Sequence, residues 1–159
     1  MTALQMLERR RHDSHALVVF GSVETPKGTL AADVIFEKLM ADRRWFFRRF
    51  PRLLSHGSRV LFYQSAVGIR GEATVEDMSL KRTDVLAGSL VCLPFGTEVV
   101  LKDVLVYSEP VPLKDIVADL EFVKDKKYWG NSLRTSPRSI SKRDYEFIAT
   151  RARGQHDNA

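Results

Sequence analysis

The hydrophobic positions of this chain follow two different periods, which predicts a mixture of strands and helices. Residues 69–76 alternate strictly between apolar and polar side chains, as expected of a strand with one face buried. The large residues at 59–64 predict a second strand, and the short loop between the two predicts an antiparallel hairpin. The β-branched, apolar run at 16–21 predicts a buried strand, and residues 89–93 and 97–107 predict further strands.

Helical spacing occurs in other parts of the chain. From Thr29 onward, apolar residues fall at the offsets i, i+3, i+4 and i+7 that line one helical face. Pro112 suits the first turn of a short second helix, and Ser141 with Asp144 forms a capping box that predicts a final helix. Residues 42–54 are also compatible with a helix, which Pro51 should break or kink.

The order of these elements predicts the fold class. Strands in hairpin order with helices inserted between them indicate an α+β domain on a small, curved, mostly antiparallel sheet that curls toward a barrel. We expect a single domain over residues 16–152. We expect residues 1–15 to form a flexible arm and residues 153–159 a disordered tail.

Positive charge is concentrated in two segments. The net charge is +5, yet residues 43–52 alone carry five arginines and no acid. Residues 124–143 hold seven basic side chains against Asp125, so the rest of the chain is acidic overall. This segregation predicts a polyanionic partner, either RNA or DNA.

Several other function classes find no support. No apolar run is long enough to cross a bilayer, so no membrane partner is predicted. Cys92 is the only cysteine, which excludes an internal disulfide and favours a small buried residue in a reducing, cytoplasmic compartment. His12 and His15 lack further metal ligands nearby, and no Gly-rich phosphate loop or catalytic triad order occurs, so we predict no metal and no cofactor.

The glycines of the predicted hairpin have two interpretations. Gly68 and Gly71 would let a flat ring approach the main-chain N–H and C=O groups closely. They could equally serve a β-bulge or the coiling of a curved sheet. The sequence does not decide between a ligand and a structural role.

The stretch at 128–138 combines chemical groups that suit a nucleobase and its phosphates. Trp129 offers a face for stacking, Asn131 a donor and an acceptor for a base edge, and Arg134 and Arg138 planar forks for phosphate. The structural alternative is that Trp129 packs against the core while the arginines hold an ordered loop.

The run at 43–52 interleaves arginines with aromatic rings. On a nucleic-acid-binding helix, Arg43, Arg44, Arg48 and Arg49 would contact phosphates while a ring contacts bases. The alternatives are an amphipathic helix with its aromatics in the core, and attachment to a membrane surface.

Two of these stretches resemble a known family. Residues 60–75 are similar to the central hairpin of the PUA-like superfamily, which includes EVE, ASCH and YTH-type domains, and residues 128–140 resemble an EVE- or ASCH-like ending. The resemblance implies a small pseudo-barrel with flanking helices that binds RNA or a modified nucleobase. It also implies a base-binding cleft, lined by Tyr63, Gln64, Ser65, Gly68 and Ile69.

We therefore predict a nucleic-acid-binding module that recognises a base, modified or not, in a cleft with an Arg- and Lys-rich rim. One alternative is an enzyme on the same scaffold, a nuclease or an amidohydrolase of a modified nucleoside, for which Lys81 and Thr83 are candidate residues. Another is a protein-interaction domain that docks on an acidic partner.

Overall fold

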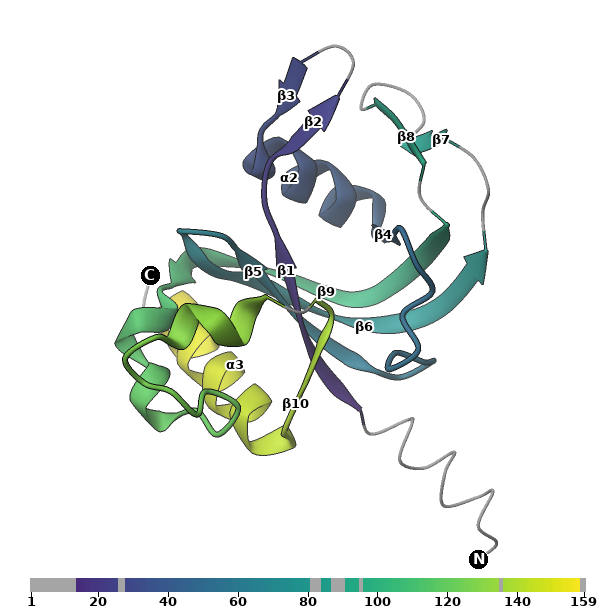
Figure 1. Cartoon of the computed structure of the whole chain (residues 1–159). Coiled ribbons are helices and arrows are strands. Elements are labelled where there is room, and N and C mark those ends of the chain that lie inside the picture. The colour runs from purple at the N-terminus through teal and green to yellow at the C-terminus, as the bar shows by residue number, and fades with distance from the viewer. Residues whose placement is uncertain are drawn as a thin grey trace, which may run out of the picture.

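The computed structural model describes residues 14–25, 28–80, 84–86, 91–94, 96–134 and 136–157. The main element is a curled six-stranded sheet with the strand order β10-β1-β5-β6-β9-β4 (Figure 1). Its strands are β1 (His15–Phe20), β4 (Arg44–Phe47), β5 (Arg59–Gln64), β6 (Gly68–Leu80), β9 (Thr97–Val111) and β10 (Arg138–Ile140). Only β1 and β5 run parallel, and the other four pairings are antiparallel. The predicted fold class and the central hairpin, β5–β6, are confirmed.

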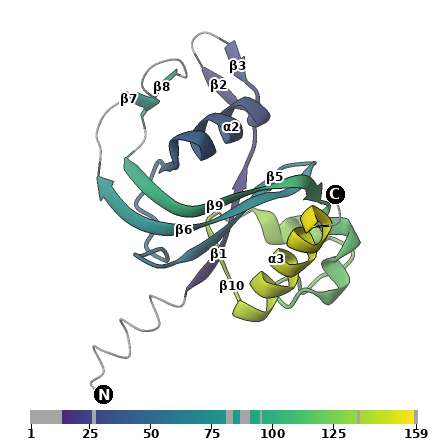
Figure 2. The ribbon, with the colours of Figure 1, turned by 180° about the vertical axis from the view of Figure 1, so that it is seen from behind.

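Two small hairpins and two helices complete the described chain. The hairpins are β2 (Val23–Thr25) with β3 (Gly28–Leu30), and β7 (Asp84–Leu86) with β8 (Val91–Pro94). The helices are α2 (Ala32–Asp42) and α3 (Lys142–Asp157), and three 3-10 turns cover Leu113–Asp115, Val117–Asp119 and Trp129–Leu133. Figures 1 and 2 show α2 on one side of the sheet and α3 on the other.

The sheet separates two hydrophobic cores, which explains why β1 and β5 are continuously apolar. Successive side chains of a strand point to opposite faces. Val60 and Phe62 accordingly enter the first core, which lies under α2, while Leu61 and Tyr63 enter the second core, which lies under α3. A strand that is covered on both faces needs apolar residues at almost every position.

Residues 42–54 do not form the expected helix. The helix α2 ends at Asp42, where Arg43 adopts the left-handed conformation at φ 55°. The chain then becomes the strand β4, which pairs with β9 and buries Trp45. Aromatic residues favour a pleated, half-buried surface, and pairing with a strand distant in sequence outweighs the local helical spacing.

The remaining differences concern the ends of elements. The helix expected after Pro112 is replaced by two 3-10 turns, although its apolar residues are still buried. Helix α3 extends to Asp157 and so includes part of the segment 153–159 for which a disordered tail was predicted. Within that part, Arg153 binds the buried carboxylate of Glu72. In the predicted arm, Ser14 is described and His15 belongs to β1, whereas residues 1–13 lie outside the described residues.

Candidate functional site

A cleft of about 740 Å³ opens between the end of β1, the helix α2 and the chain that follows β4. Its floor is apolar and includes Phe20 and Trp45, which belong to the core under α2. The Phe20 ring stacks on Phe36 at a centroid distance of 5.3 Å, and Trp45 contacts Phe20 at 5.4 Å and Phe62 at 4.8 Å. These ring contacts hold the floor in a fixed shape.

The segment after β4 forms a cationic wall of the cleft. Arg48, Arg49 and Arg52 line the cleft and are exposed. Within the described part of the chain, no hydrogen bond or ion pair engages their guanidinium groups. Between them Phe50, 48% exposed, adds an aromatic ring at the same wall.

Gly96 fixes the start of this wall. Its backbone N–H donates to the carbonyl oxygen of Phe47 at 3.1 Å. A Cβ atom at Gly96 would lie 2.7 Å from the carbonyl oxygen of Arg48. Such a contact is too short for any residue with a side chain, so the wall depends on glycine at this position.

The opposite wall is the edge of β1 with the segment that precedes β10. The strand β10 pairs with β1 only as far as Leu17. Beyond that point the Ser136 hydroxyl replaces the strand pairing. It accepts a hydrogen bond from the Val19 N–H at 2.9 Å and donates one to the Val19 carbonyl at 3.4 Å. Gly21 follows on the cleft side, and its own N–H and C=O bind no partner among the described residues.

The predicted phosphate-binding arginines of the 43–52 run lie in different environments. Arg48 and Arg49 line the cleft as described. Arg44 instead forms an ion pair with Glu98, with Nε and Oε1 2.9 Å apart. Arg43 is exposed at the turn between α2 and β4 and does not line the cleft.

None of the predicted base-binding residues lines the cleft among the described residues. Tyr63 and Ile69 are buried in the second core, and burial raises the pKa of the Tyr63 hydroxyl. At Gly68, φ is +141° and a Cβ atom would lie 2.5 Å from the Val111 carbonyl. This glycine therefore serves close packing of the chain on itself, which is the structural alternative. These residues therefore lie away from this cleft, and their role in base binding stays a prediction.

Gln64 belongs to a polar link between the hairpin and α2. Its amide donates to Asp33 Oδ1 at 2.8 Å, and Arg70 Nη1 donates to the same oxygen at 2.8 Å. These two hydrogen bonds, the Gln64 bond first, lower the pKa of Asp33. Ser65 is exposed, and its hydroxyl lies near Gly21 at the end of the cleft.

The predicted ligand-binding residues of the stretch at 128–138 also lie in different environments. Trp129 is half-buried and packs on the second core, whereas Asn131 and Arg134 are exposed. Arg138 donates to the carbonyl oxygens of Ser132 at 3.1 Å and Phe122 at 3.2 Å, so its guanidinium already has a structural role. The stretch contributes Ser136 and Pro137 to the cleft lining. Trp129, which was predicted to stack on a base, does not line the cleft.

Sequence reasoning missed the contribution of the β1 edge, Ser136 and Arg52. The interleaved arginines and rings were a usable signal for the cationic wall. No local signal marked Ser136, because its partner is 117 residues away in sequence. Lys81 and Thr83, and the side chain of Cys92, lie outside the described residues.

The side chains that line the cleft are of few chemical kinds. The described lining residues provide rings, guanidinium groups, hydroxyls and main-chain groups, but no carboxylate, imidazole or amine side chain. The described residues also contain no cluster of three or more His, Cys, Asp or Glu side chains that could hold a metal ion. No described helix is long and apolar enough to cross a membrane.

Comparison with known proteins identifies the fold. No protein-family model matches the chain, and no curated protein matches it. The crystal structure of ASCH from Zymomonas mobilis matches with a TM-score of 0.54 at 16% sequence identity, over 86% of this chain and 94% of that one. A serine-to-alanine variant of that protein matches with a TM-score of 0.54 at 15% identity, over 89% of this chain and 96% of that one.

A tyrosine-to-phenylalanine variant of the same Zymomonas mobilis protein matches with a TM-score of 0.53 at 16% identity, over 86% of this chain and 96% of that one. These matches cover most of both chains, so the likeness concerns the whole domain. The predicted resemblance to the PUA-like superfamily is therefore confirmed at the level of the fold, and the fold of this chain is that of an ASCH protein.

Proposed function

We propose that this protein binds single-stranded RNA or DNA by accommodating one unpaired base in the cleft. The observation that carries the proposal is the combination of an apolar, ring-lined floor with three exposed arginines that have no partner among the described residues. A base needs a flat apolar surface, and the adjoining phosphates need cations.

Each part of the cleft corresponds to one part of a nucleotide. The base would enter over Phe20 and Trp45, with Phe50 as a ring at the rim. Its edge would meet the N–H and C=O of Gly21, which bind no partner among the described residues, and the absence of a side chain there permits close approach. The phosphates on either side would contact Arg48, Arg49 and Arg52, whose planar forks match phosphate oxygens.

Fluorescence anisotropy with labelled ten-nucleotide RNA and DNA strands tests the proposal. We expect binding that weakens as salt rises, because each phosphate contact releases counterions. The three contacts in the cleft contribute about −2 to the slope in a plot of log K against log salt concentration. A strand that carries a modified base distinguishes general base binding from selection for that base.

Changing Arg48, Arg49 and Arg52 together to Gln separates the cleft from general surface charge. We expect affinity to fall at least tenfold at about 0.1 M salt, because the phosphate contacts are lost. A charge-matched control changes the exposed or half-exposed Lys102, Lys114 and Arg151, none of which lines the cleft. Equal losses in the two triple variants would show that binding is not located in the cleft.

The same samples test turnover. Among the described residues, the cleft lining has no carboxylate, imidazole or amine side chain that could act as a general base at neutral pH, which favours binding over catalysis. We expect the oligonucleotide to be recovered intact and with unchanged base composition after long incubation. Cleavage or base conversion that is lost in the Arg48, Arg49 and Arg52 variant would support the enzyme alternative instead.

A further inference from the structure

The segment 124–134, which we call the basic turn, has no role in the cleft. It is mostly exposed and carries Lys124, Lys127, Tyr128 and Arg134 on its surface. We propose that the basic turn is a second contact surface for the same single strand, where Tyr128 stacks on a base outside the cleft and the cations contact phosphates. This inference rests on the proposed function of the cleft.

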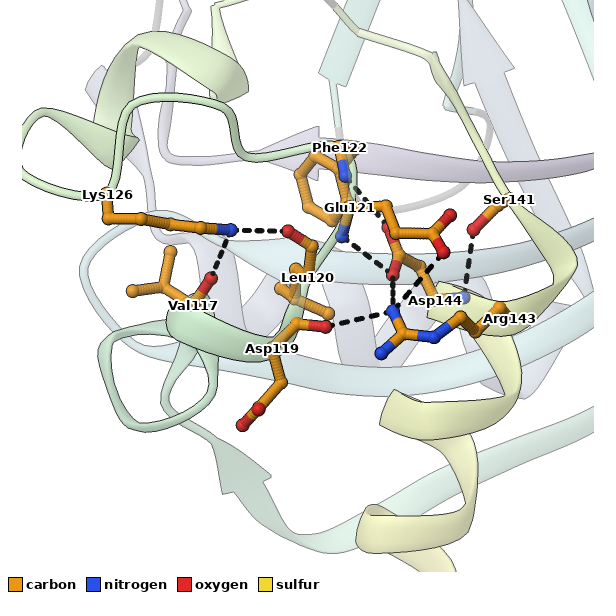
Figure 3. Close-up of polar contacts among 9 residues, drawn as sticks. All are labelled: Val117, Asp119, Leu120, Glu121, Phe122, Lys126, Ser141, Arg143 and Asp144. Carbon is orange, nitrogen blue, oxygen red and sulfur yellow. Dashed lines mark hydrogen bonds and ion pairs between the residues drawn. The ribbon is translucent and has the colours of Figure 1, made fainter.

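The basic turn is anchored at its beginning. Asp144 is fully buried at the start of α3 and accepts the N–H groups of Glu121 and Phe122, each at 2.9 Å (Figure 3). Lys126 donates to the carbonyl oxygens of Val117 at 3.0 Å and Leu120 at 2.5 Å, so this lysine is engaged and is not among the contacts we propose. A surface held in this way loses little entropy when it binds a ligand.

Tyr128 is fixed in position while its ring stays open to solvent. One carboxylate oxygen of Asp125 accepts the N–H groups of Lys127 and Tyr128, each at 3.1 Å. The Lys127 ammonium lies 5.3 Å from the centroid of the Tyr128 ring. The Tyr128 residue is nevertheless 59% exposed, which is unusual for an aromatic side chain and leaves a face for stacking.

The basic turn is continuous with the wall of the cleft. The 3-10 turn Trp129–Leu133 packs on the second core through Trp129 and Leu133. Its five residues extend about 10 Å at about 2 Å per residue. The chain then reaches Ser136, which is bonded to Val19 on the cleft wall. Arg134 is therefore nearer to the cleft along the chain than Tyr128, and a nucleic-acid strand that follows this segment away from the cleft would meet Arg134 before Tyr128.

Charge and ring chemistry together favour a nucleic acid as the occupant. Lys124, Lys127 and Arg134 are exposed, and within the described residues no carboxylate forms an ion pair with any of them. An acidic polypeptide would satisfy these cations but would not require an exposed ring. A nucleic acid uses both, through phosphates and bases.

A length series tests the proposal on the full-length chain. We compare a dinucleotide, which fills only the cleft, with a ten-nucleotide strand, and measure both with wild-type protein and with Tyr128→Ala. We expect Tyr128→Ala to weaken binding of the longer strand about fivefold or more, as expected for one lost stacking contact, and to leave the dinucleotide unchanged. Tyr128→Phe, which keeps the ring, should retain wild-type affinity.

A second variant, Lys124→Gln with Lys127→Gln, addresses the phosphates. For the longer strand we expect the slope of log K against log salt concentration to become shallower by about 1.4, which corresponds to two contacts on a single strand. The dinucleotide slope should not change.

The outcomes separate the two proposals. If neither oligonucleotide binds wild-type protein, the proposed function itself fails. If both bind but Tyr128→Ala weakens neither, or weakens both equally, the second contact surface is wrong while the cleft stands. Polyglutamate that displaces the longer strand in a Tyr128-dependent manner would overturn the assignment in favour of an acidic protein partner.

Discussion

The arginines on the two faces of the sheet behave differently, although the sequence presents them alike. On the cleft face, Arg48, Arg49 and Arg52 are exposed and without a partner among the described residues. On the α3 face, Arg138 donates to backbone carbonyls and Arg153 binds both oxygens of the buried Glu72, with donor–acceptor distances of 2.7 Å.

This contrast shows which cations can serve a ligand. A guanidinium that already binds a buried carboxylate or carbonyl cannot turn to a ligand without leaving that buried acceptor unsatisfied, which is unfavourable. A guanidinium at the cleft without a partner among the described residues gives up only hydration water when it binds a ligand. We therefore expect changes to the bonded groups Asp144 and Glu72 on the α3 face to affect stability, and changes to the unpaired arginines of the cleft to affect binding. The following experiments test that division.

The largest effect on stability is expected at Asp144. Its carboxylate is fully buried and accepts two backbone N–H groups (Figure 3). Asp144→Ala leaves these donors without a partner and should lower the free energy of unfolding by about 3 kcal/mol in urea titrations. Asp144→Asn keeps one acceptor oxygen and should lose about half as much. Unchanged stability in the alanine variant would contradict the anchoring role.

Glu72 should show the next largest effect. Glu72→Gln weakens the bonds from Arg153 and from the Tyr145 hydroxyl, which donates to Glu72 at 3.0 Å. We expect a loss of about 2 kcal/mol, less than for a fully buried pair because the Arg153 side chain is 45% exposed. Oligonucleotide affinity should remain at the wild-type value. A parallel loss of affinity would break the proposed division between the two faces.

Gly96→Ala tests the cleft face without removing any charge. The new Cβ atom would clash with the Arg48 carbonyl and displace the cationic wall. We expect affinity to fall about fivefold with a stability loss of about 1 kcal/mol. Gly154→Ala in α3 is the matched control, because a Cβ atom there meets no atom within 4 Å and the residue lies in neither proposed binding surface. Similar affinities for the two variants would show that the position of the wall does not matter.

The smallest effect is a pH dependence on the α3 face. Burial, followed by the charge of Glu72, raises the pKa of the Tyr145 hydroxyl well above its usual value. The unfolded chain loses this proton near pH 10 while the folded protein keeps it, so stability is fully present below that pH and falls as the pH rises further. We expect Tyr145 to account for about 1 kcal/mol of the loss by pH 11.

Tyr145→Phe should flatten this alkaline decline, measured as the free energy of unfolding between pH 8 and 11. Tyr107, whose pKa burial also raises, will maintain part of the slope. An identical decline in the variant would show that the Tyr145 hydroxyl titrates normally.

Much of the fold could be predicted because its signals are local. The alternation at 69–76 and the apolar runs of β1 and β5 reflect strand geometry, and the spacing in α2 and α3 reflects helix geometry. The structure of the segment 42–54 could not be predicted, because the pairing of its residues 44–47 with β9 outweighs the helical spacing of its apolar residues. The partner residues in that pairing, such as Trp45 and Val99, are far apart in sequence.

The candidate site was predictable only in part, for the same reason. The Arg-rich run indicated a cationic wall, and Arg48 and Arg49 lie there. Tyr63 and Ile69 were expected at a ligand, but the sheet buries them under α3. Whether a strand residue faces a core or a cleft depends on which elements cover the sheet, and the strand itself does not encode this.

The sequence by itself determined the periodicities, the segregation of positive charge and the aromatic content of the cleft floor. Only the tertiary structure decided which cations are free. Glu72 and Arg153 are 81 residues apart, and Arg44 and Glu98 are 54 apart. Local geometry fixes a residue's direction along its own element, whereas the satisfaction of its charge depends on contacts that exist only after the chain has folded.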